Sequence, residues 1–244
     1  MLSMKKGCSV SAKRKNLLQD ISGAVMVEFT AALTVFLLLL FGSVEFANAF
    51  YQWNAATKAV QWGARIAAVS DPIYTATPSM DFTKTVTGSN AGDALPSSAT
   101  PATNAFDITC DGTATSCTCV GAICPTMGLQ NSTAFNALVF GRGNGTSCTG
   151  TGANIGMCNL FPRITSKSNI TVRYQYTGLG YVGRPGGPVP TITVSLNQTA
   201  PIQFQFILIG GLMKIGNSAF PGFINMPSFA TTVTGEDLNA AGDP

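Results

Sequence analysis

The sequence contains no histidine, and only 10% of its 244 residues are charged. Histidine is the commonest general base near neutral pH and a frequent zinc ligand. Its absence excludes serine or cysteine catalysis that depends on a histidine partner. A typical soluble domain has about 25% charged residues. Here Gly, Ser, Thr, Asn and Ala take their place, which favours strands and turns on an exported surface.

The basic residues are concentrated at the N-terminus. Five of the 14 Lys and Arg residues lie in the first 23 positions, which hold one acid, Asp20. Basic tails often bind nucleic acid, but this tail directly precedes an apolar run, so membrane topology explains it better. We expect residues 1–23 to form a cytoplasmic leader, with no direct nucleic-acid binding. The five are Lys5, Lys6, Lys13, Arg14 and Lys15.

Residues 24–44, AVMVEFTAALTVFLLLLFGSV, carry a single charge at Glu28. About 20 apolar residues suffice for a helix to cross a bilayer. A buried core helix is the alternative, but residues 33–41 have no polar face. Because positive residues flanking a span stay in the cytoplasm, we expect a single-pass transmembrane helix over residues 24–46. The remainder would then lie outside the bacterial inner membrane, with membrane lipid as a first partner.

The helix is expected to continue beyond the membrane. No proline occurs before Pro72, and alanine, the best helix former, is frequent. We predict one helix from about Ala24 to about Val69, with residues 47–70 as a projecting amphipathic half, ended by Asp71-Pro72. Tyr51 and Trp53 lie where an interfacial aromatic belt belongs. The apolar stripe expected to face a sheet is Phe46, Ala49, Phe50, Trp53, Ala56, Val60, Ala64 and Ala67.

Residues 71–244 are expected to form an exported, disulfide-containing, β-rich domain. Apolar and polar residues alternate over ITVRYQYT, residues 170–177, which is typical of a half-buried strand. Further strands are expected at 191–196, 201–209 and 228–234, and a short helix at 132–140 with Ser132 as its N-cap. We therefore predict an α+β fold: a long N-terminal helix packed on a small antiparallel β-sheet, with a Cys-rich loop region held by disulfides.

Six of the seven cysteines lie beyond the apolar run. An even number in an exported segment favours three disulfides, and Cys148–Cys158 is the preferred pair because it closes a compact Gly-rich loop. A thiolate metal cluster is the alternative, since CTCVGAIC at 117–124 is dense in sulphur, but no CxxC knuckle or histidine accompanies it. We expect no metal and no cofactor. The seventh, Cys8, falls in the leader; the six candidates are Cys110, Cys117, Cys119, Cys124, Cys148 and Cys158.

The junction between leader and span, SGAVMVEF at residues 22–29, is the most informative motif. A lone carboxylate in a span costs roughly 2.5–3.5 kcal/mol on insertion scales, so Glu28 is a functional candidate. The junction resembles the prepilin-peptidase site of type IV pilins and pseudopilins. That resemblance implies cleavage between Gly23 and Ala24, and an assembly role for Glu28 and the adjacent Phe29. The alternative is that Glu28 lies shallowly at the cytoplasmic interface and snorkels to water.

The wider segment 23–69 resembles the TadE/TadG-like family of the Tad (tight adherence, Flp pilus) system. The matching features are GAVMVEF at 23–29, the Leu-rich run 37–40, GSVEF at 42–46 and GAR at 63–65. The resemblance implies a pilin-like minor pseudopilin of a type IVb pilus, processed by a prepilin peptidase. Its implied partners are other pilins or pseudopilins and the Tad inner-membrane assembly platform. Its implied role is pilus biogenesis, initiation or the pilus tip, supporting surface adhesion.

Three other functions are weaker alternatives. An exported adhesin or binding protein could be held by an uncleaved signal anchor. A secretory signal peptide could be cut after Ala49, although the apolar run exceeds the usual 7–15 residues. An enzyme is not expected, because the Gly-rich loop at 141–145 has no strand–loop–helix frame, and Glu236-Asp237 are more often a solvated strand end than a calcium site.

Overall fold

The computed structural model describes residues 21–77, 90–94, 106–121, 124, 126–143, 145–182, 189–207 and 223–235. The basic leader up to residue 20, with Cys8, lies outside the described residues, as does the Glu236-Asp237 pair. Leu208 and Ile209, at the end of the predicted 201–209 strand, also fall outside them.

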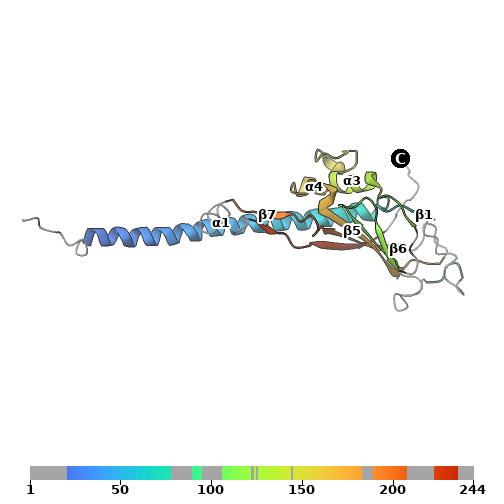
Figure 1. The fold of residues 1–244 in the computed structure, drawn as a ribbon, viewed down its shortest axis with the longest axis horizontal. Coiled ribbons are helices and arrows are strands. Elements are labelled where there is room, and N and C mark those ends of the chain that lie inside the picture. Colours follow the sequence, from blue (N-terminus) through green and yellow to red (C-terminus); the bar gives the residue numbers. More distant parts are fainter. Residues whose placement is uncertain are drawn as a thin grey trace, which may run out of the picture.

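One helix dominates the molecule. Helix α1 (Ile21–Ala68) runs without a break for 48 residues, and at about 1.5 Å per residue it is about 72 Å long. The N-terminal half extends away from the rest of the chain as a bare rod, whereas the C-terminal half lies in the globular part (Figure 1). The predicted single helix from about Ala24 to about Val69 is confirmed.

The globular part is built on an antiparallel sheet with the strand order β3-β2-β5-β6-β9. Two smaller antiparallel pairs, β1 with β4 and β7 with β8, lie beside it. The α+β prediction is confirmed. The strands are β1 (Ala76–Thr77), β2 (Phe106–Asp111), β3 (Thr118–Gly121), β4 (Thr126–Met127), β5 (Ile170–Leu179), β6 (Val189–Leu196), β7 (Gln203–Gln205), β8 (Phe223–Asn225) and β9 (Ala230–Thr234). The short helical elements are α3 (Ser132–Phe140), α4 (Met157–Leu160), η3 (Gly152–Asn154) and η4 (Lys167–Asn169).

The alternating segments form strands as expected, but the strands β1, β2, β3, β4 and β8 were not predicted. Strands β5, β6 and β9 coincide with predicted segments, and β7 is shorter than its predicted segment. Strands β2 and β3 lie in the Cys-rich stretch that was expected to be loop. The N-cap of α3 is Asn131 rather than Ser132, because the Asn131 side chain accepts a hydrogen bond from the Ala134 N–H.

Small side chains let α1 lie close to its neighbours. Ala56, Ala64 and Ala67 are buried in the same core as the inward-facing residues of β5 and β6. Gly63 faces α4, and a Cβ built there would come within 2.5 Å of the Met157 Sδ. The expected packing of the helix on the sheet is therefore confirmed. Close packing also explains the small residues Gly63 and Ala64 of the GAR segment.

A buried tyrosine ties the chain that leaves α1 to the sheet. The hydroxyl of Tyr174, on β5, accepts a hydrogen bond from the Ile73 N–H (3.1 Å), and the ring of Tyr74 meets the Tyr174 ring edge-on. Burial raises the pKa of Tyr74 to about 12 and raises the pKa of Tyr174 as well. Both phenols thus stay neutral at physiological pH.

The six exported cysteines form three disulfides: Cys110–Cys117, Cys119–Cys124 and Cys148–Cys158. The predicted number of bridges and the preferred Cys148–Cys158 pair are both confirmed. The alternative of a thiolate metal cluster is wrong, because every one of these sulphurs is bonded to another sulphur. The first bridge closes the turn from β2 towards β3, and the third joins a Gly-rich loop to α4.

Replacing Gly63 by leucine should destabilise the domain. Met157 is fully buried and cannot swing into solvent, so the overpacking should cost about 1–3 kcal/mol and lower Tm. The measurement is thermal unfolding of the full chain in detergent micelles. Gly42→Leu is the matched control, because a Cβ at Gly42 meets nothing within 4 Å. An equal Tm for the two variants would contradict the close approach of α4 to α1.

Candidate functional site

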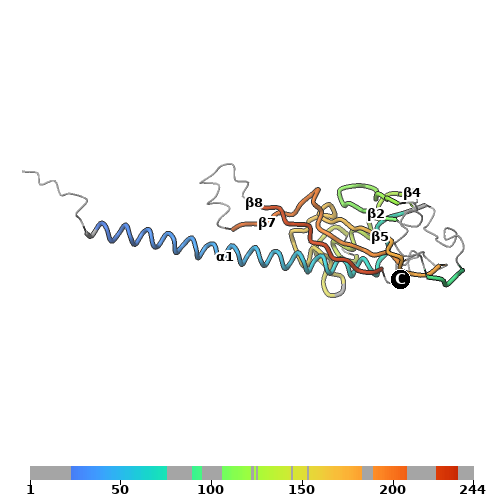
Figure 2. The backbone as a smooth tube through the Cα atoms, turned by 90° about the horizontal axis from the view of Figure 1, so that it is seen from below, coloured from blue at the N-terminus to red at the C-terminus, as the bar shows by residue number. Residues whose placement is uncertain are grey.

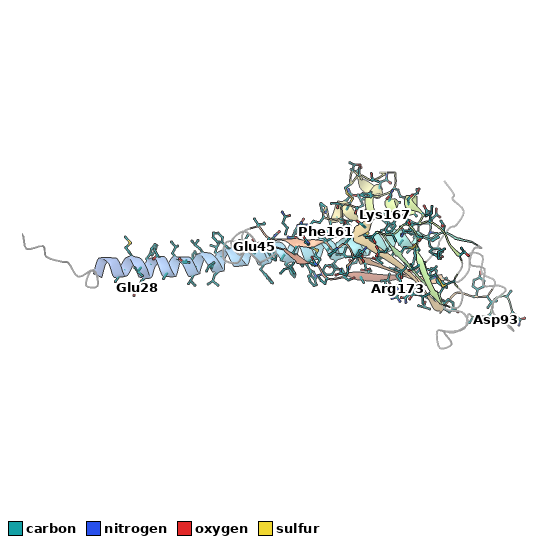
Figure 3. All side chains as sticks on the ribbon, in the orientation of Figure 1. Glu28, Glu45, Asp93, Phe161, Lys167 and Arg173 are labelled. Carbon is teal, nitrogen blue, oxygen red and sulfur yellow. A yellow bond between two sulfur atoms is a disulfide. The ribbon has the colours of Figure 1, made fainter. Side chains whose placement is uncertain are left out.

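The N-terminal half of α1 is an apolar surface that no other part of the described chain covers. Its most apolar 18-residue window is long and apolar enough to cross a membrane, and none of that window is buried. Figure 3 shows side chains radiating from this bare half, with Glu28 near its start and Glu45 where the globular part begins. A core helix of a soluble domain would be covered, so the uncovered surface fits a single-pass membrane anchor.

The hydroxyl groups in this half are satisfied within the helix itself. Thr30, Thr34 and Ser43 each donate a hydrogen bond to a carbonyl three or four residues earlier, at 2.7–3.0 Å. This arrangement is the one a span needs, because hydrocarbon offers polar groups no water. Glu28 is the exception: it is exposed, and no described residue forms a hydrogen bond or ion pair with it.

The predicted processing residues lie in the first two turns of α1. Gly23 and Ala24 are exposed, and a Cβ at Gly23 meets nothing within 4 Å. Glu28 follows Ala24 by four residues, so the helix brings these two onto one face, one turn apart. Phe29 points from the neighbouring face and is 61% exposed. The structure therefore places the four predicted residues together on an accessible helix end.

A second polar cluster joins α1 to the β7–β8 hairpin at the level where the bare half ends. The Gln52 amide donates to the Gln205 carbonyl (2.9 Å) and accepts from the Gln205 N–H (3.1 Å), so it pairs with β7 as a neighbouring strand would. Asn48 also donates to the Gln205 carbonyl (2.9 Å). One turn closer to the N-terminus, a Glu45 carboxylate oxygen accepts the Ile207 N–H (3.1 Å).

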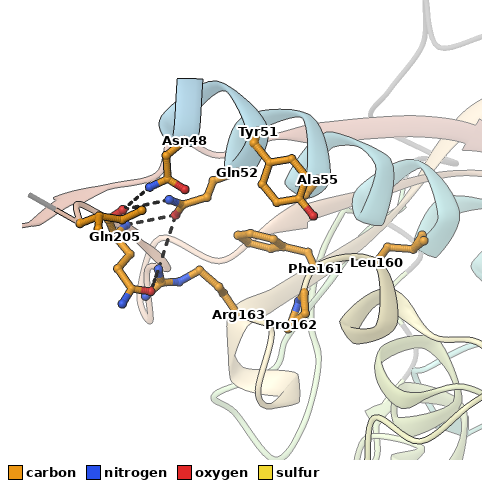
Figure 4. Close-up of a pocket in the computed structure, with 10 residues that line it drawn as sticks. Asn48, Tyr51, Gln52, Ala55, Leu160, Phe161, Pro162, Arg163 and Gln205 are labelled. Atoms are coloured by element: carbon orange, nitrogen blue, oxygen red, sulfur yellow. Dashed lines mark hydrogen bonds between the residues drawn. The ribbon is translucent and has the colours of Figure 1, made fainter. Parts of the chain in front are cut away.

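Arg163 completes this cluster from the opposite side (Figure 4). Its guanidinium donates to the side-chain oxygens of Gln205 (2.9 Å) and Gln52 (3.4 Å). Both partners are neutral amides. The ion pair found among the described residues joins Arg173 to Asp107, so Arg163 has no carboxylate partner in this part of the chain. The cluster borders an open pocket of about 430 Å³ lined by Asn48, Tyr51, Gln52, Ala55, Leu160, Phe161, Pro162, Arg163, Gln205 and Ile207.

The apolar stripe predicted from the sequence is wrong in its first two turns. Phe46 and Phe50 are 74% and 59% exposed and stack on each other instead of facing the sheet. The protein-facing positions at this level are polar, since Glu45 is 3% and Gln52 is 7% exposed. From Ala56 onwards the prediction holds, because Ala56, Val60, Ala64 and Ala67 are buried.

The sequence reasoning did not assign a site role to Asn48, Gln52 or Arg163, and Glu45 entered it only through GSVEF. A signal was available: Glu45, Asn48 and Gln52 follow the i, i+3, i+7 spacing of one helix face. Their partners Gln205 and Ile207 are more than 150 residues away, so no local pattern could identify them. Among the described residues, no group of three or more His, Cys, Asp or Glu side chains is arranged to hold a metal ion.

Replacing Gln52 by leucine should loosen the β7–β8 hairpin. The change removes the acceptor of the part-buried Gln205 N–H, and losing such a hydrogen bond costs about 0.5–1.5 kcal/mol. We expect amide exchange in residues 203–207 to accelerate roughly tenfold for each 1.4 kcal/mol lost. Hydrogen exchange read by mass spectrometry measures it, with the exposed Gln61→Leu on the same helix as control. Unchanged exchange in Gln52→Leu would show that the hairpin is held by other contacts.

Part of this helix is similar to a known protein family. Residues 23–65 match the family model for TadE-like proteins. No curated protein and no solved structure matches the chain. The match begins at Gly23, the predicted processing residue, and ends at Arg65. It therefore includes Glu28 as well as the polar side chains of α1 that contact the β7–β8 hairpin. The match shows that residues 23–65 of α1 are similar to TadE-like proteins.

Proposed function

We propose that this protein is a minor pseudopilin of a Tad-type (Flp, type IVb) pilus, anchored in the bacterial inner membrane and acting in pilus biogenesis, initiation or at the tip. The observation that carries the proposal is the uncovered half of α1, which bears one acid, Glu28, four residues after Ala24. Residues 1–23 are then a cytoplasmic leader, 24–46 the span, 47–70 the projecting half of the helix and 71–244 the exported domain. The role is structural rather than catalytic, and surface adhesion follows from it.

Processing by a prepilin peptidase fits the chemistry of the helix start. The bond between Gly23 and Ala24 is exposed but lies within helical backbone. A protease needs that turn to open, and glycine makes opening easier, because it disfavours helix by about 1 kcal/mol relative to alanine. The small side chains on both sides of the bond also leave the backbone accessible.

Glu28 would gain an ion-pair partner in the cleaved protein. Cleavage would create an α-ammonium on Ala24, one helical turn from Glu28 on the same face. In a bundle of such helices the carboxylate can pair with its own ammonium or with a neighbour's. Leaving one of the two charges buried without its partner would cost about 3–5 kcal/mol, so the pair favours a single axial register between subunits.

The size of the domain favours a minor subunit over the main filament polymer. The chain continues for 176 residues after α1, and the described part of them contains a five-stranded sheet with short helices (Figure 2). The resemblance to the Tad system implies that its main pilins are short, with little beyond their helix. A domain of the present size therefore suits a subunit used in few copies. Other pilins or pseudopilins and the inner-membrane assembly platform are its proposed partners.

An exported adhesin on an uncleaved anchor is the second candidate. The Gly-rich loop between α3 and α4, which carries the Cys148–Cys158 disulfide, favours this candidate because the loop is accessible. A secretory signal peptide cut after Ala49 is disfavoured. Such a cut would divide an unbroken helix and remove Glu45 and Asn48, which hold the β7–β8 hairpin.

The mature N-terminus separates these candidates. We expect the protein from native membranes to begin at Ala24, and to begin at Met1 when the prepilin peptidase is deleted. Intact mass and N-terminal sequencing measure this. Gly23→Leu should block cleavage, whereas Gly42→Leu, in the same apolar run, should not. A native N-terminus at Met1 would favour the uncleaved adhesin, and one at Phe50 would favour a signal peptide.

Glu28→Val tests the assembly role separately from processing. We expect cleavage to be retained or reduced only modestly, because the scissile bond is unchanged, while the number of surface pili falls. Pili counted by electron microscopy, with cleavage followed by mass, give both readouts. Thr30→Val is the matched control, since Thr30 bonds only to its own helix. Normal piliation in Glu28→Val would count against a register role for the carboxylate.

A further inference from the structure

We infer that the β7–β8 hairpin is a second membrane contact: the exposed Ile207 and Ile224 lie in the lipid interface beside α1, on the side from which the exported domain rises. The inference rests on the proposed membrane span of α1. It adds that lipid covers an apolar surface of the exported domain. The partner is the outer leaflet of the bilayer in which α1 is embedded.

The polarity of α1 is inverted where the hairpin docks. Between residues 44 and 53 the polar Glu45 and Gln52 face the protein, whereas Phe46, Phe50 and Tyr51 face outwards. A water-soluble surface has the opposite arrangement. Apolar side chains outside and satisfied polar groups inside are what a lipid environment requires. The apolar surroundings of α1 therefore extend past residue 46, the predicted end of the span.

The length of the helix agrees with this placement. With Ala24 at the inner edge of the headgroup region, Glu45 lies 21 residues or about 32 Å along the axis. That level is just inside the outer boundary of a hydrocarbon layer that is about 30 Å thick and begins about 5–7 Å from the headgroup edge. Trp53 lies 29 residues after Ala24, or about 44 Å, at the outer edge of the headgroup region of about 40–45 Å. Residues 45–52, which bind the hairpin, then fall within the interfacial layer, where tyrosine and tryptophan are favoured.

The hairpin reaches this layer with its apolar end. Strand β7 runs towards the N-terminus of α1, since Gln205 bonds to Gln52 and Asn48 while Ile207 bonds to Glu45. Both figures of the backbone place β7 at the end of the domain nearest the bare helix (Figures 1 and 2). The side chains of Ile207 and Ile224 are 64% and 54% exposed there. We call these two side chains, together with the exposed Phe46 and Phe50 of α1, the collar.

A cation beside the docked hairpin fits a lipid partner. Arg163 hydrogen-bonds only neutral amides among the described residues, those of Gln52 and Gln205. Its level, next to Gln52, is where lipid phosphates would lie, and guanidinium groups bind phosphate well.

The test measures lipid contact at the collar in the full chain. Ile207→Cys and Ile224→Cys, each in a Cys8→Ser background, are labelled with a thiol-reactive fluorophore and reconstituted into phosphatidylcholine–phosphatidylglycerol vesicles. A lipid carrying a nitroxide near the top of its acyl chain then quenches labels in the interface. Leu129→Cys is the matched control: Leu129 is 72% exposed, and its carbonyl bonds Thr75 beyond the far end of α1.

We expect roughly threefold or greater quenching at both hairpin positions relative to Leu129→Cys, because interfacial side chains lie about 5–10 Å into the headgroup–acyl boundary. Quenching at both positions equal to that at Leu129→Cys would overturn the inference. So would efficient cross-linking of Ile207→Cys to a second copy of the chain without quenching, since the collar would then be a protein interface.

A label at Leu38→Cys, in the middle of the apolar run, separates this result from the proposed function. Quenching of Leu38→Cys by a deep nitroxide, with none at the hairpin, would overturn the membrane contact and leave the span intact. No quenching at Leu38→Cys would remove the span itself, and both the proposed function and this inference with it.

Discussion

The rest of the structure depends on one constraint: a single unbroken helix has to satisfy two surroundings along its length. The first half of α1 presents apolar side chains on every face, with its hydroxyls bonded back to its own carbonyls. The second half presents alanines and a glycine to the sheet and to α4. Because no proline or cap interrupts the helix, the boundary between the two surroundings is made by side chains alone. Everything that defines the position of the domain relative to a membrane follows from where that boundary lies.

At the boundary the helix uses polar side chains as substitutes for a neighbouring strand. Strand β7 is short and has β8 on one side only, so its other edge exposes an N–H and a carbonyl at Gln205. Gln52 supplies an acceptor and a donor to that edge, and Asn48 and Glu45 extend the contact along one helix face. An open strand edge in a low-dielectric layer would carry unsatisfied groups at a cost of several kcal/mol each. The cluster removes that cost and fixes the hairpin against the rod.

Much of the fold could be predicted from local patterns. The helix followed from alanine content and the lack of proline, strands β5 and β6 from strict alternation, and the Cys148–Cys158 bridge from a short Gly-rich loop. Strand β2 was missed because its inward positions, Phe106, Ile108 and Cys110, lie among glycines and cysteines that suggest loop. The disulfide that follows it shows that the cysteines belong to a strand and its turn.

The site could be predicted only in part, for a physical reason. Periodicity reveals that a helix has an apolar face, but it does not say whether protein or lipid covers that face. Phe46 and Phe50 were therefore assigned to the sheet, although the structure turns them outwards. Glu28 stood out because a charge in an apolar run is costly wherever it lies. Glu45 and Gln52 became informative only with their long-range partners in view.

The disulfides have a mechanical consequence: each closes a loop of 5–10 residues, and none reaches α1, which contains no cysteine. Apart from the single backbone connection after Ala68, the load between helix and domain therefore passes through non-covalent packing when the helix is drawn out of a bilayer. That packing sets the force at which α1 would be peeled from the sheet.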